Sequence, residues 1–329
     1  NKYIEPICII GLSMTFAFGV LFGVNEVMGV KTTTISGNPA EEYYYEGKYE
    51  QAISEYTKLQ ERDKWPIYKV KSAEIYSIQG KLNESNNLLK EAMLDENNLL
   101  ASDPEKYLEA DKELVNEVIF TFFMNKEYEQ ALSLGEYYLE EYNTYKPLLK
   151  TMFTIYLAQG DKESAKEILK NYEVNPESSY DLAVYSKMEI VLGNYYDGLE
   201  NLGRAYSLNN NEIKVFDVIT ETAKYNKDEL LESLNALAEE NENEVSYKLF
   251  LAKTYLQDES TKTNASDILK DLDKNTDNIN IALMKLDLDT ASYSKDKWND
   301  MVDQLIDSEN SAYIGHYLKA YTYYNEGHY

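Results

Sequence analysis

The residues whose types and spacing suit chemistry are few. Asp271, Asp273 and Asn275 occupy the first, third and fifth positions of a calcium-binding loop, in which carboxylate and carbonyl oxygens surround the ion. However, Thr276 stands where such a loop needs glycine, and Ala282 stands where it needs a bidentate glutamate. A helix end followed by an Asn/Asp turn explains the same residues, and we expect no calcium site here.

No other combination of residues predicts catalysis or a bound cofactor. His316 and His328 have no metal-binding or catalytic companion at a suitable spacing, and Cys8 is the only cysteine. The chain has no phosphate-binding glycine loop, no dinucleotide fingerprint and no nucleophile elbow. Carboxylate pairs such as Glu140–Glu141 arise by chance among 58 acidic residues. We therefore expect a protein that is not an enzyme and that holds no cofactor or metal.

The net charge excludes one class of partner and favours another. The chain has 32 lysines and arginines against 58 acidic residues, a formal net charge of -26. Such a surface repels phosphate backbones and anionic lipids, so nucleic-acid binding is not expected. Proteins or peptides with basic segments are the natural partners by charge. At 329 residues, the chain is also long enough for two domains or a repeat array.

The amino-terminal segment differs from the rest of the chain, because residues 6–25 contain no charged side chain. As a helix this run spans roughly 30 Å, the thickness of a bilayer's hydrocarbon core. A cleaved signal peptide is the alternative, but no convincing small-residue cleavage site follows. Cys8 lies at the wrong end of the run for a lipoprotein anchor. We favour a retained transmembrane anchor.

These observations divide the chain into four parts. Residues 1–5 form a stub, residues 6–30 the transmembrane anchor or signal segment, residues 31–39 a linker, and residues 40–329 a helical array. Lys2 and Lys31 nearly balance the positive charge on the two sides of the anchor. Short amino-terminal anchors usually leave the large domain outside, so we expect a single-pass protein of the cell membrane whose array is extracytoplasmic.

The array contains a repeat of about 33 residues. Turn positions at Gly47, Gly80, Lys126, Gly160 and Gly193 are separated by 33, 46, 34 and 33 residues, and Asn226 follows after another 33. The long interval holds an insertion around residues 99–111. Gly327 lies about three periods beyond Asn226. The intermediate turns are expected near Glu259 and Ser294, where the sequence matches the motif poorly. Such self-similarity is typical of stacked helical hairpins.

Within each period, small and aromatic residues recur at fixed places. A small residue lies five positions after each turn, at Ala52, Ser85, Ala131, Ala165 and Gly198. The helices before the turns carry the pairs Ala73 and Tyr76, Phe153 and Tyr156, Ala252 and Tyr255, and Ala320 and Tyr323. Small residues let two helices approach closely, and aromatic rings fill the space between hairpins.

These motifs resemble the tetratricopeptide repeat (TPR) family over residues 40 to 329, with Pro66 and Pro176 at positions between repeats. The resemblance implies an all-α fold, a right-handed α-solenoid of stacked helix-turn-helix hairpins that follows one amino-terminal transmembrane helix. It implies about eight to nine hairpins, of which the last is truncated. The sixth and eighth hairpins depart from the pattern.

In this family the first helix of each hairpin lines a concave groove, which implies a set of peptide-binding residues here. They are Tyr44, Glu74, Phe120, Phe123, Lys150, Thr154, Lys187, Lys253, Tyr317 and Tyr321. Lysines in successive grooves suit carboxylates, including a carboxyl-terminal one, although Thr154 and Val184 exclude the family's dicarboxylate clamp. The alternative is that the lysines balance neighbouring acids and the aromatic rings belong to the core.

The function that follows from the resemblance is a membrane-anchored scaffold or adaptor that holds proteins at a bacterial cell envelope. Two alternatives stay open. One is a receptor or carrier that binds a peptide or small ligand in the groove. The other is the recruiting arm of an enzyme whose catalytic domain follows residue 329.

Overall fold

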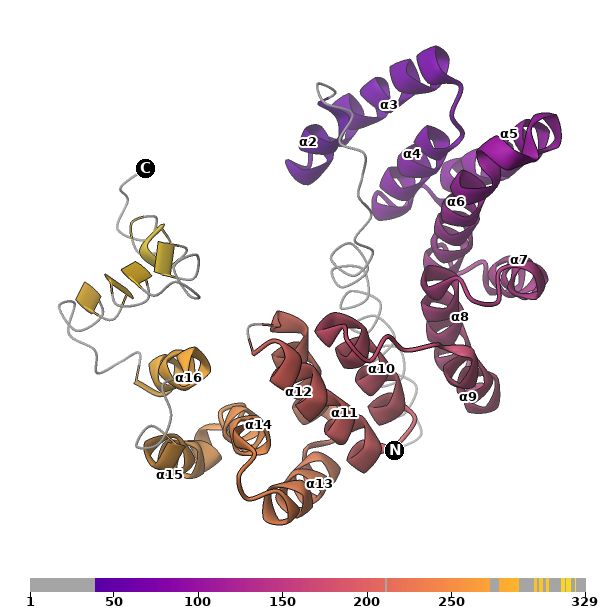
Figure 1. Cartoon of the computed structure of the whole chain (residues 1–329). Helices are drawn as coiled ribbons and strands as arrows, with labels where there is room; N and C mark the ends of the chain where they lie inside the picture. Colours follow the sequence, from indigo (N-terminus) through magenta and orange to yellow (C-terminus); the bar gives the residue numbers. More distant parts are fainter. Residues whose placement is uncertain are drawn as a thin grey trace, which may run out of the picture. The chain divides into compact units, whose positions relative to one another are not determined.

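The structure is a computed structural model, and it describes residues 39–210, 212–272 and 278–289, together with residues 299, 300, 302, 303, 306, 307, 315, 316, 318–320 and 323. Every regular element in these ranges is a helix, and they contain no β-strand. The expected all-α fold is confirmed. The chain divides into two compact units, Asn1–Glu173 and Val174–Tyr329, and each is described by itself (Figure 1).

Unit 1 is a series of helical hairpins joined by short turns. Its helices are α2 (Ala40–Tyr45), α3 (Tyr49–Asp63), α4 (Ile67–Ile78), α5 (Leu82–Ser102), α6 (Pro104–Met124), α7 (Tyr128–Glu141), α8 (Lys146–Ala158) and α9 (Lys162–Asn171). Each even-numbered helix packs against the helix that follows it, α4 also packs against α6, and α6 packs against α8. The even-numbered helices therefore form one layer and the odd-numbered helices the other.

Unit 2 repeats this arrangement with α10 (Ser179–Val191), α11 (Tyr195–Leu208), α12 (Ile213–Tyr225), α13 (Lys227–Glu240), α14 (Val245–Tyr255), a short 3₁₀ helix η1 (Glu259–Thr261), α15 (Lys262–Leu272) and α16 (Ile279–Asp289). Contacts join α10 to α12, α12 to α14 and α14 to α16. The stacked hairpins expected from the repeat are confirmed in both units. The sequence interpretation is also right that Pro66 and Pro176 lie between hairpins.

The turn positions have a common backbone conformation. Gly47, Gly80, Gly160 and Gly193 have φ between +71° and +97°, and Lys126 has φ of +64°. At Gly47, the glycine N–H donates to the Tyr44 carbonyl and the next N–H donates to the Tyr43 carbonyl, at 3.0 and 2.8 Å. This is the Schellman ending of a helix, which needs one left-handed residue and favours glycine there.

The sixth hairpin breaks this rule, as its sequence suggested. Asn226 has φ of -141° and is the single residue between α12 and α13. The seventh hairpin departs as well, since Glu259 opens η1 in place of a glycine turn. Ser294 and Gly327 lie outside the described residues.

The small residues after the turns lie at the closest contacts between paired helices. Ala52, Ser85, Ala131 and Ala165 are fully buried. A Cβ atom on Gly198 would lie 2.7 Å from Ile190 Cγ1 and 3.0 Å from the Ser186 carbonyl oxygen. Because these are shorter than van der Waals contacts, α10 and α11 can approach this closely only with glycine at this position.

The insertion around residues 99–111 forms no loop of its own. It lengthens both α5 and α6 to 21 residues, and only Asp103 separates them. Among the described residues, no helix has the length and apolar character needed to cross a bilayer. The segment 6–30, predicted as a membrane anchor, lies outside the described residues.

Candidate functional site

The even-numbered helices of unit 1 hold most of the residues that the sequence assigns to a groove. Tyr44 lies on α2, Glu74 on α4, Phe120 on α6 and Lys150 on α8, and all four are partly buried. Because α4 packs against α6 and α6 against α8, these side chains come from one layer of helices. The surface of this layer in unit 1 is called the first-helix surface below.

A charged cluster lies at the centre of the first-helix surface. The Lys71 ammonium of α4 is 3.4 Å from a Glu74 carboxylate oxygen on the same helix and 3.0 Å from the Glu117 carboxylate on α6. The Glu117 side chain is only 3% exposed. Burial alone would lower the pKa of Lys71, but the Glu117 and Glu74 carboxylates outweigh it and hold that pKa well above its usual value. Lys71 therefore stays charged.

The carboxylates of this cluster outnumber its cation. Burial, together with the charge of Glu117, raises the pKa of Glu74 to about 7 although Lys71 opposes the shift. Burial and the charge of Glu117 also raise the pKa of Glu113 on α6. Three carboxyl groups thus share one lysine, and the cluster retains a capacity to accept a cation or a hydrogen-bond donor.

An aromatic side chain lies beside these charges. Burial, with the nearby Glu74 carboxylate, raises the pKa of Tyr44 to about 12. The Tyr44 ring lies 5.4 Å from the Tyr45 ring and 6.2 Å from the Tyr49 ring, and Tyr45 is well exposed. Tyrosine faces attract lysine and arginine, so the aromatic group adds to the preference of the carboxylates for a cationic ligand.

Two of the predicted groove residues belong to the interior. Phe123 is buried and packs its ring 5.8 Å from the Tyr128 ring of α7. Thr154 is buried on α8, and its hydroxyl donates to the Lys150 carbonyl at 2.9 Å. Phe123 therefore fits the alternative that the aromatic rings belong to the core. Tyr317 and Tyr321 lie outside the described residues.

The predicted lysines of unit 2 lie on its own even-numbered helices. Lys187 of α10 pairs with Glu221 of α12 at 2.5 Å and is mostly buried. This pair fits the interpretation that lysines balance acids across neighbouring hairpins. Lys253 is half-buried on α14.

No family model matches the chain, and no curated protein sequence matches it. Solved structures do show similarity. One is a tetratricopeptide repeat protein from Parabacteroides merdae, 15% identical, with 78% of this chain and 97% of that chain covered at a TM-score of 0.38. Another is Naa15/Naa10 bound to HypK-THB, 15% identical, with 88% of this chain and 50% of that chain covered at a TM-score of 0.30. Neither similarity decides a family or an activity.

Sequence reasoning missed Lys71, Glu113 and Glu117. Lys71 lies three residues before Glu74, and Glu113 lies four residues before Glu117. Each of these two pairs therefore lies on one helical face, and that signal is present in the sequence. It is not specific, because such pairs abound in an acidic helical chain. The contact between Lys71 and Glu117 also joins two hairpins across the insertion, and the repeat does not fix their register there.

A second acidic group lies between the lengthened helices α5 and α6. Glu96 of α5 and Asp111 of α6 are both fully buried. Asp111 accepts a short hydrogen bond from the Tyr142 hydroxyl, whereas neither Glu96 carboxylate oxygen has a hydrogen-bond partner. Burial first, and the charge of Asp111 second, raise the pKa of Glu96 to about 7. This pair is internal and offers no surface to a ligand.

Only some of the other candidate metal-binding residues fall in the part of the chain that the structure describes. There, no three His, Cys, Asp or Glu side chains gather in a way that would hold a metal ion. His316 is exposed, and Asp271 is exposed at the end of α15. Asp273, Asn275 and His328 lie outside the described residues.

Proposed function

We propose that this chain is a TPR-like scaffold that binds protein partners through its first-helix surface, and that its role is binding and not catalysis. The stacked hairpins supply a rigid layer of even-numbered helices on which side chains from successive repeats meet. The observation that carries the proposal is the cluster of Glu74, Glu113 and Glu117 around the single Lys71.

The partner that this surface suits is an extended segment with lysine or arginine side chains. A guanidinium or ammonium group would compensate the excess carboxylates with charge-assisted hydrogen bonds. The Tyr44 ring beside them offers a face to the same cation. The formal net charge of -26 would speed the approach of such a partner.

In the proposal, residues 6–30 anchor the scaffold in the cell membrane of a bacterium, with the array on the extracytoplasmic side. The uncharged run 6–25 supports the anchor. The scaffold would then recruit proteins of the cell envelope.

A comparison of two variants with the same change in charge tests whether partners bind the first-helix surface. Glu74→Gln with Glu113→Gln removes two carboxylates from the first-helix surface. Glu163→Gln with Glu167→Gln removes two from the outer helix α9, where Glu163 is 84% exposed. Affinity capture with mass spectrometry identifies the partners, and fluorescence anisotropy with an arginine-rich peptide measures affinity. Only the first variant is expected to lose partners and to weaken peptide binding several-fold.

Equal partner lists and equal peptide affinities for the two variants would show that binding uses another surface. The lysines provide a separate comparison. Lys150→Glu with Lys187→Glu is expected to weaken capture only of partners that bind through carboxylates, without unfolding the array, whereas a partner that binds through lysine or arginine side chains should be retained. Lys166→Glu with Lys170→Glu on α9 is the control.

A further inference from the structure

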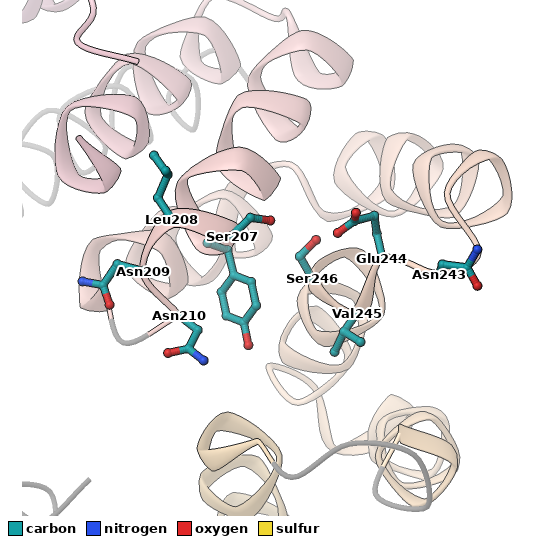
Figure 2. Close-up of a pocket in the computed structure, with 9 residues that line it drawn as sticks. Ser207, Leu208, Asn209, Asn210, Asn243, Glu244, Val245 and Ser246 are labelled. Carbon is teal, nitrogen blue, oxygen red and sulfur yellow. The ribbon is translucent and has the colours of Figure 1, made fainter. Parts of the chain in front are cut away.

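Unit 2 contains a pocket that the first-helix surface does not include. It has a volume of about 500 Å³ and lies between the end of α11 and the start of α14 (Figure 2). Its walls are the last turn of α11 with Asn209 and Asn210 after it, and the first turn of α14 with Asn243 and Glu244 before it. This volume is in the range of small-molecule sites. The lining is mainly serine, asparagine and glutamate, so a ligand there would be polar.

One wall of the pocket contains a hydroxyl with no partner. Ser246 is 2% exposed, and its Oγ makes no hydrogen bond. Figure 2 shows this hydroxyl directed to the side of the pocket where Ser207 and Glu244 lie. A buried hydroxyl is normally paired, because leaving it unpaired destabilises the fold. The hydroxyl of Ser207, by contrast, already donates to the Gly203 carbonyl at 3.0 Å.

The same wall carries unused hydrogen-bond donors. The first N–H groups of a helix have no acceptor within that helix, and the Glu244 side chain at the cap of α14 does not accept from them. These N–H groups also give the start of α14 a partial positive charge. Together with the Ser246 hydroxyl, they are suited to a carboxylate.

The pocket also offers acceptors for a cation. Glu244 is exposed and supplies a carboxylate next to the α14 donors. The last carbonyl groups of α11 have no donor within their helix and carry a partial negative charge. A ligand with adjacent positive and negative groups therefore matches the pocket better than a simple anion, which the chain's net charge of -26 would repel.

The opposite wall is held in place before any ligand arrives. The Tyr206 hydroxyl accepts from Asn278 Nδ2 at 2.6 Å, and the Asn210 carbonyl accepts from Asn280 Nδ2 at 2.8 Å. These bonds tie the loop after α11 to the start of α16. A wall fixed in this way lowers the entropy lost on binding.

We propose that this pocket binds a free α-amino acid with a polar side chain. Its carboxylate accepts from the α14 N–H groups and the Ser246 hydroxyl, and its ammonium pairs with Glu244. Its side chain lies among Ser207, Asn209 and Asn210. The proposal does not depend on the first-helix surface and concerns a different class of ligand.

Isothermal titration calorimetry tests it with L-asparagine, L-glutamine, L-serine and L-threonine on the full chain. At least one is expected to bind with a stoichiometry of one. Its N-acetyl and α-amide derivatives, which lack the ammonium or the carboxylate charge, are expected to bind at least about tenfold more weakly.

Two variants test whether the amino acid binds at Ser246 and Glu244. Ser246→Ala and Glu244→Gln are each expected to weaken binding about tenfold. The control Ser72→Ala removes a buried hydroxyl from α4 in unit 1, where it donates to the Tyr68 carbonyl, and it should leave affinity unchanged. Ser246→Ala removes only an unpaired group, so it should fold with an unchanged or higher Tm. Glu244 is exposed, so its substitution does not disturb the core.

Two results would overturn the proposal. One is the absence of saturable binding by all four amino acids at millimolar concentration. The other is binding that Ser246→Ala and Glu244→Gln leave unchanged, because the amino acid would then occupy a different place.

Discussion

Replacing Glu96 by glutamine should stabilise the protein at neutral pH. Glu96 is fully buried without a hydrogen-bond partner, and burial with the charge of Asp111 raises its pKa from 4.5 to about 7. Other charged or titratable groups face this hairpin: Tyr142 donates to Asp111, Lys112 lies 5.7 Å from the Tyr142 ring centroid, and Glu141 adds to the shift of Asp111. Glutamine keeps the shape of the side chain and removes its charge.

The magnitude follows from linkage between protonation and folding. Because the folded state holds the Glu96 proton more tightly than the unfolded chain, stability is greatest below the unfolded pKa of 4.5 and falls as pH rises toward 7. A difference of this size corresponds to about 3 kcal/mol of unfolding free energy, fully expressed above pH 7. Glu96→Gln should therefore gain about 3 kcal/mol relative to the wild type at pH 8 and almost nothing at pH 4.

Urea denaturation of the full chain, monitored by circular dichroism at several pH values, measures this difference in unfolding free energy. The comparison must use variant minus wild type, because Glu74 has a raised pKa in the same range. Glu163→Gln on the exposed side of α9 serves as the control and should show no pH-dependent gain. A Glu96→Gln difference that stays constant from pH 4 to pH 8 would refute the reasoning.

Three further predictions concern stability. Lys71→Met should lower the unfolding free energy by about 3 kcal/mol in urea denaturation at pH 7.5, because it leaves the 3%-exposed Glu117 carboxylate without its cation. Adding Glu117→Gln should restore much of the loss. A neutral effect of Lys71→Met alone would contradict the ion pair. Gly198→Ala should cost about 2 kcal/mol, since its Cβ would lie 2.7 Å from Ile190 Cγ1, and the thermal midpoint should fall; an unchanged midpoint would show that α10 and α11 are less tightly packed. Lys126→Gly should raise stability by about 1 kcal/mol, because Lys126 has a left-handed φ of +64°, whereas Lys126→Ala, which keeps a Cβ atom, should not.

The repeat was predictable because its signals are local. A turn glycine indicates a residue with left-handed backbone conformation, and the small residue five positions later indicates a close contact between two helices. Both inferences depend on a few neighbouring residues, and Gly47 with Ala52 illustrates them: the first has φ of +71° and the second is fully buried. Lys126 shows that the spacing can identify a turn even where the preferred residue is missing.

The site was less predictable because its contacts join different hairpins. Lys71 and Glu117 are 46 residues apart, and the insertion between them changes the register. Nothing in the sequence distinguishes Glu117 or Glu96 from the many solvated acids of the chain, since burial depends on which helix covers them. The pocket at Ser246 is defined by loop ends, where the repeat pattern is weakest.

The stacking of each hairpin on its immediate neighbours has a consequence for how the chain loses structure. Within each unit, the described hairpins stack mainly on their immediate neighbours, so stability is expected to vary from hairpin to hairpin, and unfolding can begin at a weak interface without melting the rest. The buried carboxyl groups of Glu96 and Asp111 lower the stability of the α5–α6 interface as pH rises, because burial raises the pKa of both groups. Amide hydrogen exchange in α5 and α6 should therefore become faster as pH rises, after correction for the intrinsic exchange rate.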